Sequence, residues 1–200
     1  WTYPDFRTQE YIDIFNQSWG FDDFRPIAID SVYLAQLRLG TLNYRDGKGA
    51  IYVRAAGNGY VASRVDAGGE ATVLSDSEGN FLSQNANSEG LNSNPYTLVV
   101  GALNANGRKA SYSTAGAAVW ISGLGGEDGG TRPAMVTTDM PGCGEGFSHD
   151  SSRDWVTGNA PRNPFEWGAD QKTLNPSCDY TSIMNGTSSA APSIAGLVAL

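Results

Sequence analysis

The sequence predicts an α/β fold with a mainly parallel central sheet, and three observations carry that prediction. Residues 10–19 alternate as a strand does, residues 29–42 have the spacing of an amphipathic helix, and residues 50–57 form a short apolar run that ends in glycine. A strand, a helix and a second strand in that order are typical of a parallel βαβ unit. Glycine makes up 25 of the 200 residues, against a usual share of about 7%, which favours short elements joined by tight turns. Further buried strands are expected at 96–103, 117–124 and 134–140.

The predicted helix has the clearest local reason. Either Asp30 or Ser31 is available as its N-cap. Its apolar side chains are Val32, Ala35, Leu37, Leu39 and Leu42. Two other stretches are expected to be loop insertions, an acidic one at about 59–95 and a long one at 141–182 that is rich in Gly, Pro, Asn and Ser. Long loops in compact domains are commonly functional or cross-linked.

Length and charge narrow the possible functions. A chain of 200 residues and 21.2 kDa is long enough for one domain with a substantial core. Thirteen Lys and Arg against 21 Asp and Glu give a net charge of −8 and a pI near 4.5. No basic stripe is present to displace counterions from phosphates, which argues against a nucleic-acid partner. No run of about 18 apolar residues is present either, so no membrane span is predicted.

The two cysteines bracket the long insertion. Cys143 and Cys178 lie 35 residues apart and permit at most one internal disulfide. On the chain-entropy view, closing that loop would stabilise the fold by about 4 kcal/mol. A disulfide indicates an oxidising compartment, so we expect a secreted or periplasmic protein. The alternative is a pair of buried free thiols.

The last sixteen residues contain a candidate nucleophile. From Ser189 onward the sequence is small and apolar and predicts a buried helix, with Gly186 and Thr187 forming the turn into it and Pro192 in its first turn. Ser188 therefore lies where loop becomes helix, and the free N–H groups there favour negative charge. A serine at this junction is a plausible nucleophile whose own N–H can stabilise an oxyanion. The alternative is a simple N-cap.

At this point the sequence resembles a known family. The run G-T-S-S-A-A-P-x-x-A-G, residues 186–196, resembles the nucleophile motif of the subtilisin-like serine proteases, and A-A-G-N-G, residues 55–59, resembles the segment that carries their oxyanion asparagine. The resemblance implies helices on both faces of the sheet, an acyl-enzyme on Ser188, and an oxyanion contact from the Asn58 amide beside Gly57. The alternative for Asn58 is a turn residue that tolerates left-handed geometry.

A third segment is similar to the kexin and furin branch of that family, where S-W-G-x-x-D-D is typical. Here the segment is S-W-G-F-D-D, and Ser18, Trp19 and Gly20 would line the first specificity pocket. The resemblance implies that Asp23 holds a basic P1 side chain, with Glu89 as a second pocket acid. Two carboxylates in a cleft favour Arg or Lys at P1. The alternative for Asp22 and Asp23 is a solvated acidic turn.

The catalytic triad is incomplete in this chain. Subtilisin-like catalysis needs a general-base His and an Asp that orients it, and neither motif precedes Ser18. The one His, His149, lies in the long insertion and is expected to be a surface residue. We therefore expect this chain to be the C-terminal part of a peptidase domain, with Asp and His supplied by sequence upstream. The alternative is a catalytically inactive binding module with the same fold.

Calcium and partners follow from the same resemblance. Thr114 stands where the kexin branch has an acid that helps to bind calcium, so this chain departs from the branch at that ion site. The resemblance still implies structural calcium in the complete domain, without an assignable site. A calcium-stabilised binding domain that uses Asp66, Asp76 and Glu78 is a further alternative. The expected partners are a peptide or protein substrate, the upstream part of the domain, and a propeptide or chaperone.

Overall fold

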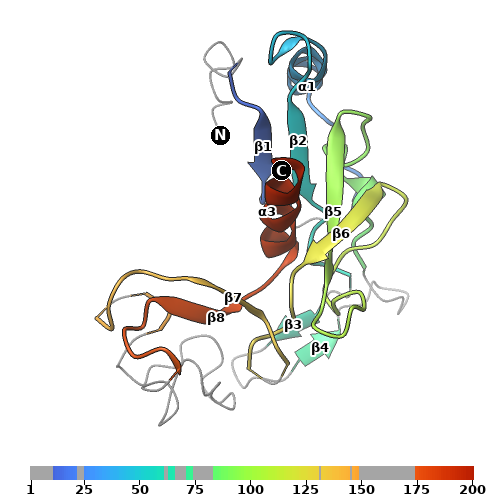
Figure 1. Ribbon diagram of the computed structural model, residues 1–200. Coiled ribbons are helices and arrows are strands. Elements are labelled where there is room, and N and C mark those ends of the chain that lie inside the picture. Colours follow the sequence, from blue (N-terminus) through green and yellow to red (C-terminus); the bar gives the residue numbers. More distant parts are fainter. Residues whose placement is uncertain are drawn as a thin grey trace.

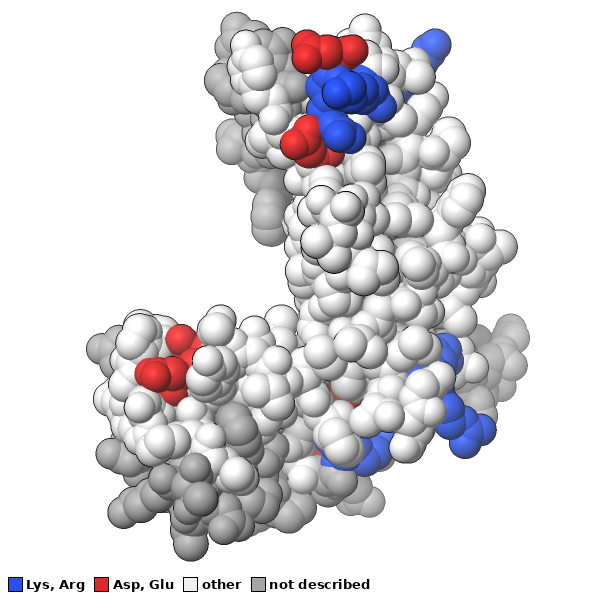
Figure 2. Space-filling view, in the orientation of Figure 1, with Lys and Arg blue, Asp and Glu red and all other residues white. Residues whose placement is uncertain are grey.

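The structure is a computed structural model that consists of a body, built on a parallel sheet, and an arm that projects from it (Figure 1). Figure 2 shows the body and the arm meeting at an angle, with a hollow between them. The structure describes residues 11–21, 25–60, 63–65, 71–73, 83–130, 132–144, 146–148 and 174–200.

The body is built on a four-stranded sheet in which every neighbouring pair is parallel, as predicted. Its strands follow the order β1 (Ile14–Gln17), β2 (Ile51–Ala55), β5 (Thr97–Leu103) and β6 (Val119–Leu124). The helix α1 (Ser31–Asn43) connects β1 to β2, which confirms the βαβ unit. Asp30 is its N-cap, because its side chain accepts hydrogen bonds from the N–H groups of residues 32 and 33 at 2.9 and 3.0 Å.

Alternating side chains of the strands form two apolar cores, one on each face of the sheet. On one face, Val53 and Val100 pack against Ala190 and Ile194 of α3 (Thr187–Val198). On the other, Tyr52 packs with residues of α1, and the members of that cluster are Tyr33, Leu37, Tyr44, Ala50, Tyr52 and Leu91. The three-layer α/β fold is therefore confirmed. The sheet lies between α3 and α1, each of which packs on one of its faces.

The arm corrects one prediction. The strand expected at 134–140 exists as β7 (Met135–Thr138), but it lies outside the central sheet and pairs antiparallel with β8 (Tyr180–Met184). Its side chains are mostly exposed, so the prediction of a buried strand is wrong. The run A-M-V-T-T-D-M is apolar enough for a core strand, but among the described residues it pairs with β8 alone. β6 was also predicted to be buried, and its side chains too are largely exposed.

The two predicted insertions contain short regular elements. In the first lie the antiparallel pair β3 (Ser63–Val65) and β4 (Ala71–Val73) and a 3₁₀ turn at Ala86–Ser88. In the second, β8 was not predicted, because its sequence Y-T-S-I-M is short and half polar. No helix among the described residues is long and apolar enough to cross a membrane.

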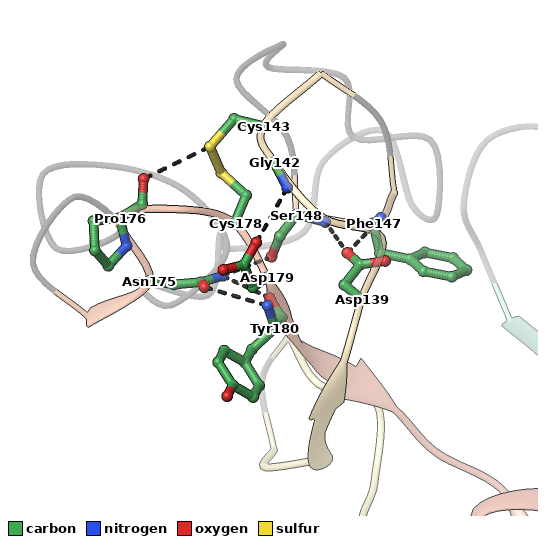
Figure 3. The surroundings of a disulfide bond; sticks show 10 residues. All are labelled: Asp139, Gly142, Cys143, Phe147, Ser148, Asn175, Pro176, Cys178, Asp179 and Tyr180. Atoms are coloured by element: carbon green, nitrogen blue, oxygen red, sulfur yellow. Dashed lines mark hydrogen bonds between the residues drawn. A yellow bond between two sulfur atoms is a disulfide. The ribbon is translucent and has the colours of Figure 1, made fainter.

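A disulfide joins the chain segments beyond the paired strands of the arm, at the end away from α3, as predicted. Cys143 and Cys178 are bonded, with Cα atoms 5.0 Å apart. Beside the disulfide, the Asp139 carboxylate accepts hydrogen bonds from the N–H groups of Phe147 and Ser148, each at 2.7 Å, and the Asp179 carboxylate accepts one from Gly142 at 3.1 Å (Figure 3). The turn that follows β7 is therefore held by a covalent cross-link and by two carboxylates.

Candidate active site

The sequence-predicted residues meet at the carboxyl-terminal edge of β1 and β2. β1 leads into Ser18, β2 leads into Gly57 and Asn58, and the amino-terminal end of α3 brings Ser188 to the same edge. In open parallel sheets, sites commonly form outside the carboxyl ends of the strands, because the loops that follow neighbouring strands converge there.

Ser188 is the second residue of α3, which begins at Thr187 rather than at Ser189 as the sequence suggested. The N-cap is Gly186, whose φ of +96° lies in the region that favours glycine. The hydroxyl of Ser188 donates to the carbonyl oxygen of Ser18 at 3.3 Å. Among the described residues nothing accepts a hydrogen bond from the Ser188 N–H, so a helix N-terminal donor is open beside this hydroxyl.

Pro192 explains a second contact between the same two serines. It is the sixth residue of the helix, so the expectation that it lies in the first turn is wrong. Because proline has no N–H, the Ser188 carbonyl four residues earlier has no partner within the helix. The hydroxyl of Ser18 donates to that carbonyl at 2.9 Å instead. Pro192 therefore leaves the Ser188 carbonyl free to accept the Ser18 hydrogen bond, which joins the start of α3 to the end of β1.

Asn58 is bonded to the residue next to the candidate nucleophile. Its Oδ1 accepts from the backbone N–H and from the hydroxyl of Thr187, both at 2.9 Å. The same hydroxyl accepts from the N–H of Gly57 at 3.1 Å. These donors identify the oxygen end of the amide. Nothing in the described part of the chain accepts from its Nδ2, so that donor is available at the exposed side of the site.

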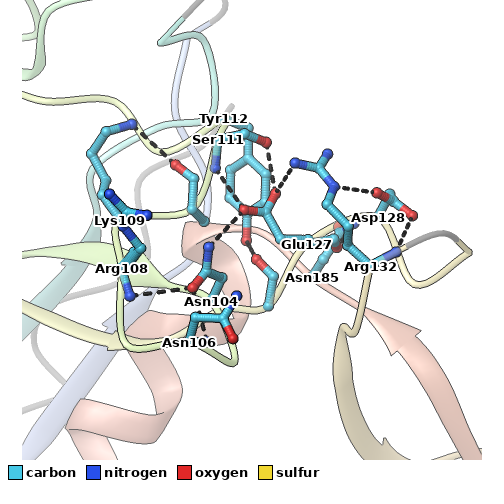
Figure 4. Close-up of polar contacts among 12 residues, drawn as sticks. Asn104, Asn106, Arg108, Lys109, Ser111, Tyr112, Glu127, Asp128, Arg132 and Asn185 are labelled. Atoms are coloured by element: carbon cyan, nitrogen blue, oxygen red, sulfur yellow. Dashed lines mark hydrogen bonds and ion pairs between the residues drawn. The ribbon is translucent and has the colours of Figure 1, made fainter.

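Tyr112 supports the turn into α3 from behind (Figure 4). Its hydroxyl accepts from the N–H of Gly186 at 2.8 Å and donates to the carbonyls of Gly125 and Gly126, at 2.7 and 3.0 Å. Burial raises the pKa of Tyr112, so the phenol remains protonated and keeps its donor. The side chain of Asn185 continues the support by donating to the backbone carbonyl of Glu127 at 2.8 Å.

The Glu127 carboxylate is the ionic centre of that network. It is 4% exposed and accepts from the N–H and the hydroxyl of Ser111, at 3.0 and 2.6 Å, and from Asn104 at 3.1 Å. Arg132 lies 3.3 Å from it. Burial alone would raise the pKa of Glu127, but these hydrogen bonds and the charge of Arg132 outweigh it and hold the pKa below its usual value.

Glu89 also approaches the site, but it is already partnered. It forms an ion pair with Arg54, whose side chain is fully buried in β2. The Arg54 guanidinium lies 4.4 Å from the centre of the Trp19 ring, which is 42% exposed at the end of β1. A Cβ placed on Gly20 would lie 3.2 Å from Oε2 of Glu89. The structure therefore brings Trp19, Gly20 and Glu89 together, next to Ser18.

Several sequence-predicted residues have no described position or no matching chemistry. Asp23, His149 and the alternative calcium ligands Asp66, Asp76 and Glu78 lie outside the described residues. Thr114 offers no carboxylate for calcium, and its hydroxyl oxygen accepts a hydrogen bond from the N–H of Gly59 at 3.1 Å. No group of three or more His, Cys, Asp or Glu side chains that could hold a metal occurs in the described part of the chain. Calcium in the complete domain therefore stays a prediction, and the described residues assign no site to it.

Three residues of the site were missed by sequence reasoning, namely Thr187, Tyr112 and Arg54. Arg54 carried a usable signal, since an arginine inside the apolar run A-I-Y-V-R-A-A-G predicts a buried and paired charge. Tyr112 carried none, because its contacts with Gly186 join segments 74 residues apart.

The comparisons with known proteins agree with this geometry. The Subtilase family model matches residues 4–200. The extracellular serine protease of Aeromonas sobria is 40% identical over 190 residues, which cover 94% of this chain and 28% of that protein. The microbial serine proteinase of Aeromonas salmonicida is 40% identical over 151 residues, covering 76% of this chain and 22% of that protein.

Solved structures give the same result. The crystal structure of the Aeromonas sobria serine protease has a TM-score of 0.72 and 37% identity, over 93% of this chain and 30% of that one. The crystal structure of that protease in complex with a chaperone has a TM-score of 0.72 and 36% identity, over 93% of this chain and 29% of that one. The chain thus spans less than a third of the length of these relatives. With a family match across nearly all of its residues, the chain belongs to the subtilase family.

Proposed function

We propose that this chain supplies the nucleophile and oxyanion-binding part of a serine endopeptidase. The observation that carries the proposal is the placement of Asn58, whose Oδ1 is held by Thr187 while its Nδ2 has no acceptor among the described residues. An amide fixed at its oxygen end presents its N–H groups in a set direction. Such a preorganised donor is what an oxyanion hole requires, because it need not reorganise as charge develops.

In the proposed reaction, Oγ of Ser188 attacks the carbonyl carbon of the scissile peptide bond. Its proton passes to a general-base His that comes from outside the described residues, and the carbonyl oxygen becomes an oxyanion that accepts hydrogen bonds from Nδ2 of Asn58 and the N–H of Ser188. Collapse breaks the C–N bond as the His passes its proton to the leaving nitrogen, so that the amine departs and an acyl-enzyme remains. Water then hydrolyses the ester and returns the proton to Ser188.

We propose Arg or Lys at P1, bound where Trp19, Gly20 and Glu89 meet. A small pocket on one side of Glu89 is lined by Phe21, Arg25, Ala56, Asn92 and Thr114 among others, so one arginine also faces it. Glu89 supplies negative charge to it, and Asp23 is proposed as the second acid. Carboxylates in a partly desolvated cleft bind guanidinium and ammonium groups through charge-assisted hydrogen bonds.

The relatives support proposals about the whole protein. One is named as an extracellular protease, and this chain contains a disulfide, so we propose a secreted or periplasmic enzyme. The complex of the Aeromonas sobria protease with a chaperone supports a chaperone partner here too. We propose that the Asp and His of the triad lie upstream of this chain. Structural calcium stays a prediction for the complete domain, with ligands from outside the described residues.

A fluorophosphonate probe that reacts with activated serines tests the proposal on the full-length encoded protein. We expect stoichiometric labelling of Ser188, located by mass spectrometry, and no labelling of the Ser188→Ala variant. Ser193→Ala is the matched control, because that serine lies one turn further along α3 and bonds only to a helix carbonyl; it should label as the wild type does. A folded protein that leaves Ser188 unlabelled would support the inactive binding module instead.

A further inference from the structure

Arg54 is an unusual residue for the middle of a buried parallel strand. Its side chain is 0% exposed, and a buried charge is costly unless it is paired and hydrogen-bonded. Its Nε donates to Oδ1 of Asn92 at 2.9 Å, its Nη1 donates to Oε1 of Gln17 at 3.4 Å, and its Nη2 pairs with Oε1 of Glu89. Burial lowers the pKa of Arg54 and the Glu89 charge raises it.

The carboxylate of Glu89 contacts both Arg54 and Gly20. Oε1 pairs with Nη2 of Arg54, and a Cβ on Gly20 would lie 3.2 Å from Oε2 and 3.5 Å from Oε1. Gly20 is two residues beyond Ser18, whose carbonyl accepts from the Ser188 hydroxyl. Glu89 lines the small pocket, whereas Arg54 is fully buried and is not among the residues that line it.

We propose that Arg54 is a positioning residue that sets how strongly this pocket selects for a positive P1 side chain. This inference rests on the proposed function. Arg54 pairs with Glu89 and balances its charge, so the pocket offers a P1 cation a neutralised carboxylate instead of a free anion. The difference in binding between a charged and an uncharged P1 side chain is then smaller than it would be beside an unpaired glutamate.

Citrulline is a sharp probe of this arrangement, because it has nearly the shape of arginine but no charge. In the full-length protein we compare kcat/KM for two peptides that differ only in Arg or citrulline at P1, with enzyme concentration set by Ser188 titration so that misfolded protein is not counted. Arg54→Met frees Glu89 and should raise the Arg-to-citrulline ratio about tenfold, or about 1.4 kcal/mol. Arg54→Lys keeps the charge and should stay within about twofold of the wild type.

Replacing Glu89, the partner of Arg54, should lower the Arg-to-citrulline ratio. Glu89→Gln leaves the Arg54 charge uncompensated and should lower the ratio about tenfold, while the double variant Arg54→Met with Glu89→Gln should return toward the wild type. Arg38→Met removes an exposed arginine on α1 and should leave the ratio unchanged.

A purely structural role for Arg54 predicts something different. In that case Arg54→Met would lower the amount of titratable enzyme and leave the ratio unchanged, which overturns the proposal. If Arg54→Met yields no labelled protein, Glu89→Gln decides alone, since a lowered ratio supports the proposal and an unchanged ratio overturns it. Failure of the proposed function is seen separately, as absence of Ser188 labelling in the wild-type protein.

Discussion

Two regions of the molecule are stabilised in opposite ways. One is the corner where Ser18, Asn58, Thr187 and Ser188 meet, and the other is the arm formed by β7 and β8. At the corner, contacts join residues as much as 170 positions apart, and the groups bonded to Ser188, Thr187 and Asn58 in the described structure are all uncharged. In the arm, a disulfide joins residues 35 positions apart, and the carboxylates of Asp139 and Asp179 hold the turn.

The difference has a chemical reason under the proposed function. An oxyanion that forms beside Ser188 would be destabilised by a neighbouring carboxylate, so the first contacts of this site use hydroxyls, an amide and backbone groups. The carboxylates of Glu89 and Glu127 lie outside these first contacts, and each forms an ion pair with an arginine. The arm has no such constraint, and it uses charge and a covalent bond to order a turn that has little apolar core.

The largest expected effect is on the arm. Replacing both cysteines, Cys143→Ser with Cys178→Ser, should cost the arm up to about 4 kcal/mol of loop-closure stabilisation. Hydrogen exchange measured by mass spectrometry should speed up at the N–H groups of Gly142, Phe147 and Ser148, while exchange in α3 stays slow. Equal acceleration in α3 would show that arm and corner unfold as one unit, and would contradict the comparison.

The Asn58→Asp variant tests the role of the amide nitrogen of Asn58 separately from the role of its oxygen. The variant keeps an oxygen for the Thr187 N–H but has no Nδ2 donor and adds a negative charge. We expect kcat/KM to fall about 10²–10³-fold, a magnitude taken from loss of the equivalent donor in subtilisin, with a Tm close to that of the wild type. Asn58→Ala, which loses both ends, should lower activity and Tm together. Activity within tenfold of the wild type for Asn58→Asp would count against the proposed oxyanion contact.

Tyr112→Phe should have the smallest effect of the three. The change removes the acceptor for the Gly186 N–H and the donor to Gly125 and leaves them without partners, which costs about 1–3 kcal/mol. Urea unfolding of the purified protein measures that cost. Tyr60→Phe is a suitable control because the Tyr60 side chain is partly exposed and its ring, which contacts Lys109 at 3.6 Å, is retained. Equal stability of the two variants would show that Tyr112 does not hold the turn.

The sequence predicted the elements of the body because their signals are local. The Asp30 cap predicts where α1 begins, and uninterrupted apolar runs predict β2 and β5. The apolar face predicted for α1 is wrong, because of its five residues only Leu37 is buried, and the buried residues of the helix are Tyr33, Leu37 and Gly40. The arm was harder to predict. Nothing within residues 134–140 distinguishes a strand of the central sheet from one that pairs only with β8, since the difference lies in the partner and not in the strand itself.

The candidate site was predictable to the extent that its residues sit in specific motifs. Ser188 and Asn58 were identified that way, and the structure places them on adjoining segments. Glu89 was predicted as a pocket acid, but its pairing with Arg54 depends on packing between residues 35 positions apart, which no local pattern reveals. Tyr112 was missed for the same reason.

The most direct test of the central claim is a crystal structure of the full-length protein after reaction with a phosphonate inhibitor. The phosphonyl oxygen stands in for the oxyanion of the tetrahedral intermediate. We predict a covalent bond from Oγ of Ser188 to phosphorus, and Nδ2 of Asn58 about 2.7–3.1 Å from that oxygen. An adduct on Ser188 whose phosphonyl oxygen points away from Asn58, toward other donors, would contradict the account.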